Sequence, residues 1–220
     1  MTIVIGFVAG FLAWGLGEYV LHRFAMHELH GKGIMSREHL QHHVKADWSF
    51  GPMMLLSWLG IAVVGSLGLL PIGWLAVSLP FGIALAVGWA VGYFFYEYQH
   101  AAAHLKAPRG WYSTMVRHHH FHHHFGHPMA NHGVTTPFWD IVFRTREKPE
   151  LVRVPRRLVM AWMVDADGEL LPAYQGHYVL VGTVGSTDRL AAIDKARAFA
   201  SQAPLDGLDD PLVDAELVSP

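Results

Sequence analysis

Histidines recur in this sequence at spacings that suit metal binding. They fall in four short segments, HRFAMH (22–27), HLQHH (39–43), HAAAH (100–104) and HFHHH (120–124). On a helix, residues at i, i+3 and i+4 share one face, so each of the last three segments directs two or three imidazoles towards a common point. Imidazole nitrogen binds iron, copper, nickel and zinc, so residue type alone does not choose the metal. The candidate ligands are His22, His27, His39, His42, His43, His100, His104, His120, His123 and His124.

The number of candidate ligands indicates two metals. A first-row metal accepts about four to six ligands, and these imidazoles exceed what one ion can use. The first segment differs, because five residues at about 100° each place His22 and His27 about 140° apart on an α-helix. Either the helix ends between these two histidines or they bind different metals. Glu18, one turn before His22, could accept the second N–H of that ring and fix its tautomer.

An affinity tag or a metal-buffering tract fits these histidines less well. An expression tag would stand at a terminus and would not be interrupted by Phe121. A metal-buffering tract does not need matching segments that are separated by two apolar spans. The chain has no cysteine, which excludes disulfides, thiolate metal sites and iron–sulfur clusters. The isolated histidines are expected to be structural or interfacial, and they are His30, His127, His132 and His177.

Long apolar runs must position these segments. Only 15% of the residues are charged and the mean hydropathy is +0.24, which is unusual for a soluble globule. No Asp, Glu, Lys, Arg or His occurs in residues 51–96, a stretch long enough for two crossings of a hydrocarbon core about 30 Å thick. We predict one span over residues 53–70, a turn at Pro71 with Gly73, and a second span over residues 72–97 that must tilt or kink.

A third span is predicted at the N-terminus, because residues 2–24 are apolar and lack both a basic start and a signal-peptide cleavage site. Three crossings place all four histidine segments on one side of the membrane. That side carries Arg23, Lys45 and Lys106, whereas the opposite side has no Lys or Arg, so the positive-inside rule predicts that it is cytoplasmic. We therefore predict a multi-pass protein of a bacterial inner membrane with its histidine segments in the cytoplasm.

The character of the chain changes after Pro155. Residues 157–185 predict β-strands that turn at residues 165–168, and residues 186–203 predict a capped amphipathic helix. An acidic stretch, residues 206–220, closes the chain.

The predicted fold class is therefore an all-α integral membrane protein. It has about three transmembrane helices, cytoplasmic helices that carry the histidine segments, and a small C-terminal α+β appendage. We expect residues 1–150 to form the membrane-embedded domain and residues 151–220 to form a cytoplasmic tail, to which we assign no catalytic role.

In their order and intervals, the histidine segments resemble the membrane-bound fatty acid hydroxylase superfamily, which includes fatty acid 2-hydroxylases, sterol desaturases and carotenoid hydroxylases. The resemblance covers residues 15–147. It rests on EYVLHRFAMH, HLQHH, YEYQHAAAH, the fourth segment and NHGVTTPFWDIVFRT (131–145). HxxxxH in the first segment and HxxxH in the third are most similar to the fatty acid 2-hydroxylase branch.

The fourth segment can be aligned with the family in two registers. Placing Gly133 in register with the family's GVT motif favours the register used above. The two sets are His120, His123 and His124, or alternatively His119, His122 and His123.

The resemblance implies a dinuclear non-haem iron oxygenase that uses O₂ and two external electrons to hydroxylate or desaturate an unactivated C–H bond of a lipid chain. The implied cofactors are two iron ions, for which zinc can substitute in a purified sample. No HPGG-like haem-binding segment occurs in the chain, so the electrons are expected to come from a separate protein. The expected partners are a lipid substrate, O₂, that electron-transfer protein and the membrane, with no nucleic acid.

Three carboxylates are candidate catalytic residues that would orient the ligands, namely Glu18, Glu97 and Asp140. Asp140 could equally cap a helix or pair with Arg144. Two alternatives remain open: a sterol or carotenoid desaturase or hydroxylase of the same superfamily, and a non-catalytic histidine-rich membrane protein that binds metal. A metal transporter is disfavoured, because it would need polar groups inside its spans.

Overall fold

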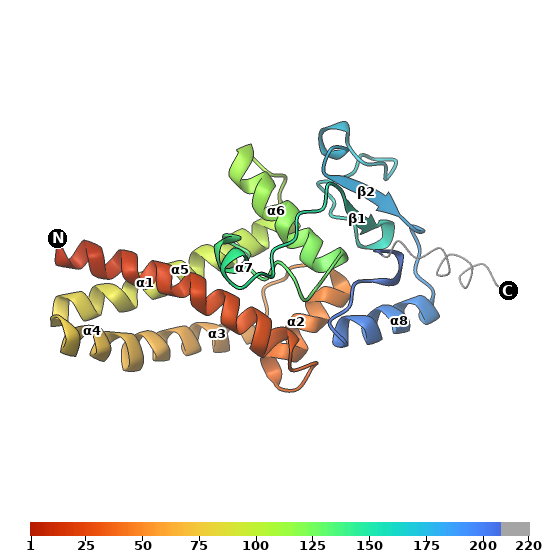
Figure 1. Ribbon diagram of the computed structural model, residues 1–220. Coiled ribbons are helices and arrows are strands. Elements are labelled where there is room, and N and C mark those ends of the chain that lie inside the picture. The colour runs from red at the N-terminus through yellow and green to blue at the C-terminus, as the bar shows by residue number, and fades with distance from the viewer. Residues whose placement is uncertain (208–220) are drawn as a thin grey trace.

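Three long helices form an apolar stem, and shorter elements form a head at one end of it (Figure 1). The structure is a computed structural model and describes residues 1–207. Helix α1 (Thr2–Val20) continues through a π-helical turn, η1 (Leu21–His27). Three helices are long and apolar enough to cross a membrane, as the sequence predicts. They are Thr2–His27, Pro52–Ala76 and Leu79–Leu105.

The first and third helices of the stem pack closely along their length. Helix α5 (Leu79–Leu105) runs beside α1, and glycines at the contact let the two backbones approach each other. A Cβ atom at Gly10 would lie 2.0 Å from the carbonyl oxygen of Leu85, and one at Gly88 would lie 2.0 Å from that of Phe7. Larger side chains at these two glycines would therefore force the helices apart.

The second helix of the stem is built from three consecutive pieces. They are α3 (Pro52–Val63), the π-helical turn η2 (Val64–Leu69) and α4 (Leu70–Ala76).

The predicted turn at Pro71 and Gly73 is wrong, because both residues lie within α4. Pro71 sits in the first turn of that helix, where a missing N–H costs little. The chain turns instead at Val77 and Ser78, and the Ser78 hydroxyl accepts a hydrogen bond from the backbone N–H of Phe81 at 3.4 Å. The second span therefore extends to Ala76 and the third begins at Leu79.

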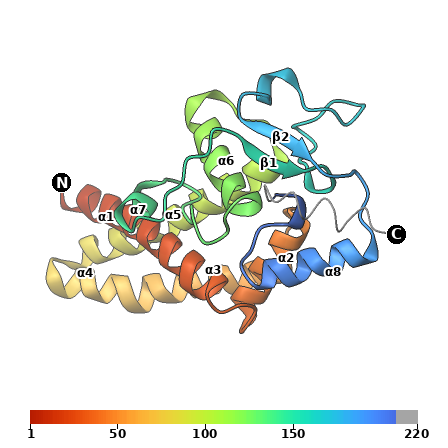
Figure 2. The same ribbon diagram turned by 45° about the vertical axis from the view of Figure 1, so that its right-hand side comes forward.

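The head carries the histidine segments at the end of the stem away from the N-terminus (Figures 1 and 2). Helix α2 (Ile34–Lys45) follows η1, and α6 (Gly110–Phe125) follows α5. The short helix α7 (Phe138–Val142) lies against α1. All four histidine segments therefore meet at one end of the stem.

The C-terminal appendage, defined here as residues 152–207, packs against the head. Strands β1 (Val152–Pro155) and β2 (Tyr178–Val181) pair in parallel. Helix α8 (Asp188–Phe199) begins after Thr187, whose hydroxyl accepts from the N–H of Leu190 at 3.2 Å, so the predicted capped helix is present. The short 3₁₀ turns are η3 (Arg156–Leu158), η4 (Pro172–Tyr174) and η5 (Leu205–Gly207).

The predicted hairpin around residues 165–168 is reduced to a single antiparallel bridge between Val164 and Leu170. The turn itself is present, because the N–H of Gly168 donates to the carbonyl of Asp165 at 3.1 Å. Most of the acidic stretch predicted at residues 206–220 lies outside the described residues.

One hydrophobic core joins the appendage to the histidine-bearing helices. Phe121 and Phe125 of α6 are fully buried against Val154 of β1 and Met163. The indole N–H of Trp162 donates to the carbonyl of Ala103 in α5 at 2.9 Å. The appendage is thus held against the helices that carry the third and fourth histidine segments.

Candidate metal centre

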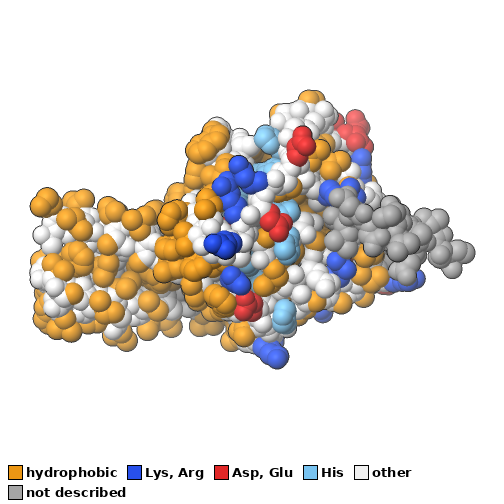
Figure 3. Space-filling view, viewed as in Figure 1, with side chains coloured by type: hydrophobic (Ala, Val, Ile, Leu, Met, Phe, Trp, Pro, Cys, Tyr) orange, Lys and Arg blue, Asp and Glu red, His pale blue; other side chains and the backbone are white. Residues whose placement is uncertain are grey.

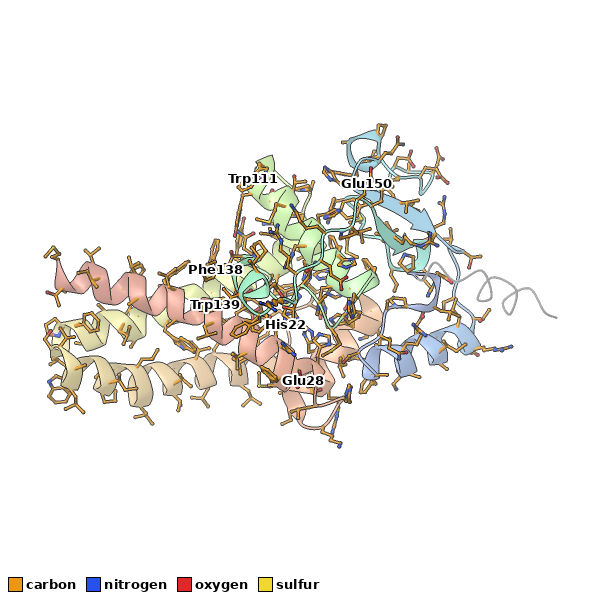
Figure 4. The ribbon with its side chains drawn as sticks, viewed as in Figure 1. His22, Glu28, Trp111, Phe138, Trp139 and Glu150 are labelled. Atoms are coloured by element: carbon orange, nitrogen blue, oxygen red, sulfur yellow. The ribbon has the colours of Figure 1, made fainter. Side chains whose placement is uncertain are left out.

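The ten predicted histidines converge in two buried clusters. Within each cluster, the possible ligand atoms all lie within 4.8 Å of one another. In Figure 4, His22 of the first cluster lies where the end of the first stem helix meets the head. The first cluster consists of His22, His27, His39, His43 and His123, and the second of His42, His100, His104, His120 and His124.

Helical spacing divides the histidines of α2 between the clusters. His39 and His43 are four residues apart and point into the first cluster, whereas His42 points into the second. The rings of His43 and His124 stack at 4.1 Å between centroids, so the two clusters are neighbours.

Helix α6 divides its histidines in the opposite way. His120 and His124 are four residues apart and enter the second cluster, whereas His123 enters the first. Helix α5 contributes only to the second cluster, through His100 and His104.

The π-helical turn η1 accounts for how His22 and His27 share a cluster. In a π-helix the hydrogen bond joins residues five apart, as in the bond from the N–H of Glu28 to the carbonyl of Arg23 at 3.0 Å. Residues at i and i+5 therefore come onto the same face. The predicted helix end between these histidines is wrong, because the helix continues through η1. The predicted alternative, separate metals, has no support in the geometry, because both histidines lie in the first cluster.

The spacing of the imidazole nitrogens fits bound metal ions. In the first cluster the Nε2 atom of His27 lies 2.9 Å from that of His39 and 3.0 Å from that of His123. In the second cluster the Nε2 atoms of His104 and His120 lie 3.0 Å apart. With a metal–nitrogen bond of about 2.1 Å, two ligands at a right angle lie about 3.0 Å apart. Where Nδ1 carries the proton on both rings of such a pair, the two Nε2 lone pairs repel each other at this distance, and a cation between them relieves the repulsion.

Burial keeps the histidines of α2 and α6 in the neutral form that binds metal. Desolvation lowers the pKa of His42 to about 4, although its hydrogen bond to Asp47 acts in the opposite direction. For most of the others, neighbouring imidazoles add to the effect of burial. The pKa values that burial lowers well below the usual range are those of His39, His43, His120, His123 and His124.

Backbone carbonyl groups orient several of the rings. The Nδ1 atom of His22 is 2.5 Å from the carbonyl oxygen of His132, and that of His123 is 2.8 Å from the carbonyl oxygen of Ala130. The Nδ1 atom of His104 is 2.9 Å from the carbonyl oxygen of Ala46. A carbonyl oxygen can only accept, so Nδ1 carries the proton and Nε2 keeps its lone pair for a metal.

Asp140 holds the loop that supplies the Ala130 and His132 carbonyl groups. Its carboxylate is fully buried and accepts hydrogen bonds from four donors. Burial alone would raise the pKa of Asp140, but the hydrogen bond from His119 and the donors of the loop lower it below its usual value. The four donors are His119 Nε2 at 3.0 Å, Thr145 Oγ1 at 2.8 Å, and the N–H groups of His132 and Gly133, each at 2.8 Å. Asp140 thus orients the loop, and its hydrogen-bonded partner is His119 rather than Arg144.

Glu18 holds the other end of the same loop. Its Oε1 atom accepts from the N–H groups of Val134 at 2.5 Å and Thr135 at 2.9 Å, and its Oε2 atom accepts from the Thr135 hydroxyl at 2.7 Å. The predicted hydrogen bond from His22 to Glu18 is wrong, because the carbonyl of His132 takes that place.

Glu97 faces Tyr93, whose hydroxyl donates to it at 2.7 Å. Within residues 1–207 no hydrogen bond joins Glu97 to a cluster histidine. Its predicted part in orienting a ligand is therefore not visible in the geometry.

His119 and His122, which only the alternative register of the fourth segment includes, point away from the clusters, whereas His123, which both registers share, enters the first cluster. His119 pairs with Asp140, and His122 donates to Glu147 at 2.7 Å, where His127 also donates at 2.6 Å. His132, expected to be merely structural, is fully buried beside the first cluster and orients His22 through its backbone. A backbone carbonyl has no sequence signature, so this role could not be found from residue types.

Three helices long and apolar enough to cross a membrane end at two buried histidine clusters. These are the features of a membrane protein with two candidate metal sites. The chain belongs to the fatty acid hydroxylase family: the family model described as "Fatty acid hydroxylase" matches residues 7–145. The hydroxylase family implies an oxidoreductase.

Curated relatives agree with this family. The chain is 33% identical over 156 residues to a fatty acid 2-hydroxylase of Macaca fascicularis and 32% identical over 154 residues to one of Rattus norvegicus. Each match covers 66% of this chain but only 41% and 40% of those proteins, so the chain spans about two fifths of their length.

A solved structure of full-length Scs7p, in which only the hydroxylase domain is visible, shares the fold. Its TM-score is 0.51 at 23% identity, and the match covers 67% of this chain and 57% of that one.

Proposed function

We propose that this protein is an O₂-dependent di-iron hydroxylase that inserts oxygen into an unactivated C–H bond of a lipid acyl chain. Electrons would come from a separate protein. The observation that carries the proposal is the pair of adjacent five-histidine clusters, whose Nε2 atoms are spaced as ligands of two metal ions. The macaque and rat relatives are fatty acid 2-hydroxylases, which supports an acyl chain as the substrate.

The chemistry accounts for a site built from metal ligands. An alkyl C–H bond has no acidic proton and no carbonyl group, so acid–base residues cannot activate it. A bound pair of iron ions would supply the oxidant. The protein's own task is to hold ten neutral imidazoles in place, and Asp140 and Glu18 contribute by fixing the loop that orients His22 and His123.

A cavity of about 220 Å³ supplies a route to the second cluster. It lies between residues 45–48, the end of α5 and residues 157–161 of the appendage, and His104 lines it. Lys45 at this cavity is exposed and could bind a lipid carboxylate or phosphate. Residues 45–48 lead into α3, so a lipid could reach the cavity from the end of the stem.

We place the stem in the membrane and the histidine clusters on its cytoplasmic side. Figure 3 shows hydrophobic side chains over the stem, with Lys and Arg gathered on the head where it joins the stem. This arrangement fits the positive-inside rule. The assignment to a bacterial inner membrane stays a prediction, since the two relatives come from macaque and rat.

The test is to purify the protein with iron and supply a lipid, O₂ and an electron donor. We expect two irons per chain and a hydroxylated product that forms with O₂ consumption. His123→Ala should abolish metal loading at the first cluster and turnover. The matched control is His122→Ala, which removes the neighbouring histidine that faces Glu147 and should leave both intact.

Two results would overturn the proposal. Full iron loading without O₂-dependent product, for every lipid class tried, would favour a protein that only binds metal. Unchanged metal loading and turnover in His123→Ala would show that the first cluster is not a catalytic metal site, because both registers of the fourth segment include His123.

A further inference from the structure

The C-terminal appendage reaches the first histidine cluster. Helix α8 lies beside α2, which carries His39 and His43 of the first cluster and His42 of the second (Figure 2). Ser201 follows α8 and is buried, with its hydroxyl oxygen 3.3 Å from Nδ1 of His27 and 3.1 Å from the carbonyl oxygen of His27. The family match ends at residue 145, so Ser201 lies outside the part of the chain that the family accounts for.

The two contacts of Ser201 define the tautomer of His27. A serine hydroxyl has one proton, and here it donates that proton to the His27 carbonyl. The same oxygen can then only accept from Nδ1, so Nδ1 of His27 carries the ring proton. The Nε2 atom of His27, which faces His39 and His123, is left with its lone pair directed into the cluster.

The backbone at Ser201 indicates that the hydroxyl is needed there. Ser201 has a φ of +54°, in the left-handed region, directly after the C-cap residue Ala200. Glycine is the usual residue at such a position, because a Cβ atom is disfavoured in that conformation. A serine there carries a conformational cost that the contacts with His27 offset.

Other contacts hold the end of the appendage against the clusters. The buried Arg157 side chain pairs with Asp194 of α8 at 2.7 Å and with Asp206. Between the appendage and the clusters, a cavity lined by His43, His124 and Gln202 measures about 10 Å³. Such a space holds about one water molecule at most, so the appendage seals this face of both clusters.

We propose that the appendage is a working part of the metal centre and that Ser201 is a positioning residue that orients His27 for metal binding. This inference rests on the proposed function only in that His27 is a metal ligand. It goes beyond the sequence-based prediction, which assigns the tail no catalytic role.

The test compares metal affinity with fold stability in full-length protein. Ser201→Gly removes the hydroxyl and relieves the left-handed backbone, so the metal-free protein should unfold at the same or a higher temperature. Its affinity for cobalt(II) at one of the two sites should fall by about 10- to 100-fold, the usual effect of losing such a partner of a metal ligand. Cobalt(II) absorption bands report the ligand field without any turnover.

Two further variants serve as rescue and control. Ser201→Thr keeps the hydroxyl but adds a branched Cβ in the left-handed conformation, so it should retain cobalt affinity while it lowers the unfolding temperature. His30→Gly is the matched control, because His30 also has a left-handed φ of +49° but is exposed. It should change neither cobalt affinity nor the cobalt spectrum.

The outcomes separate this inference from the proposed function. Two cobalt ions bound by the wild type with unchanged affinity in Ser201→Gly would overturn the role of Ser201. An equal loss of affinity in His30→Gly would show that relief of the backbone, and not the hydroxyl, is responsible. Failure of the wild type to bind cobalt would instead overturn the metal centre itself.

Discussion

Asp140→Asn removes the charge from the carboxylate that holds the loop of residues 130–135 in place. Asp140 accepts from four donors, and two of these are the backbone N–H groups of His132 and Gly133. The asparagine side chain has one carbonyl oxygen and one NH₂ group in place of two carboxylate oxygens. In the variant, the NH₂ group must therefore face two donors that in the wild type donate to a carboxylate oxygen. At least one buried N–H group in the loop is then left without an acceptor.

The expected loss of stability follows from the hydrogen bonds that Asp140 accepts. A hydrogen bond to a charged group contributes about 1.5–3 kcal/mol, and a buried donor without a partner costs about 1–3 kcal/mol. We therefore expect Asp140→Asn to lower the free energy of unfolding by about 3–5 kcal/mol, the combined size of these two effects. The loop also supplies the carbonyl groups that orient His22 and His123, so metal affinity at the first cluster should fall by about 10- to 100-fold.

The assay measures iron per chain after challenge with a chelator, together with thermal unfolding of the metal-free protein. Retained iron should drop from two towards one, because the second cluster receives no ligand-orienting contact from this loop. Glu147→Gln is the matched control: its side chain also accepts from two histidines but is 45% exposed, so it should cost about 1 kcal/mol or less. Equal effects of the two substitutions, or equal loss of both irons, would refute the reasoning.

Three further predictions concern acid, the Glu18 end of the loop and the cavity. Burial lowers the pKa of the cluster histidines in α2 and α6, so the unfolded chain binds more protons below about pH 6.5. The free energy of unfolding of the metal-free protein should then fall as the pH drops below 6.5, by up to about 1.4 kcal/mol per pH unit for each histidine. An unfolding free energy that is the same at pH 7 and pH 5 would show that these histidines do not have lowered pKa values. Glu18→Ala leaves the buried N–H groups of Val134 and Thr135 without an acceptor and should cost about 2–4 kcal/mol in chemical unfolding, whereas an unaltered midpoint would show that this contact is dispensable. Ala161→Trp should fill the cavity beside His104 and lower kcat/KM about tenfold with iron content unchanged; wild-type kinetics would place the substrate route elsewhere.

Much of the metal centre could be predicted from the sequence, because helical spacing carries the information. His39 and His43, or His120 and His124, share a helix face whatever the rest of the fold does. The apolar runs likewise predict the three long helices.

The remaining features depend on contacts that residue types do not encode. His22 and His27 share a cluster only because a π-helical turn replaces the α-helix there. The partner of His22 is a backbone carbonyl 110 residues away along the chain. Ser201 is 174 residues from His27, and only the packing of α8 on α2 brings them together.

The turn of the stem was predicted at the wrong place for a local reason. Proline and glycine usually mark turns, but Pro71 fits the first turn of a helix that follows a π-helical segment. The actual turn at Val77 and Ser78 is marked by the Ser78 cap and by Pro80 in the first turn of α5.

The most direct test of the central claim is anomalous diffraction at the iron absorption edge from crystals of the iron-loaded protein. We predict two peaks per chain. One should lie within bonding distance of the Nε2 atoms of His27 and His123, and the other within bonding distance of the Nε2 atoms of His104 and His120. A single peak, or peaks that lie away from these imidazole rings, would contradict the assignment of two iron sites.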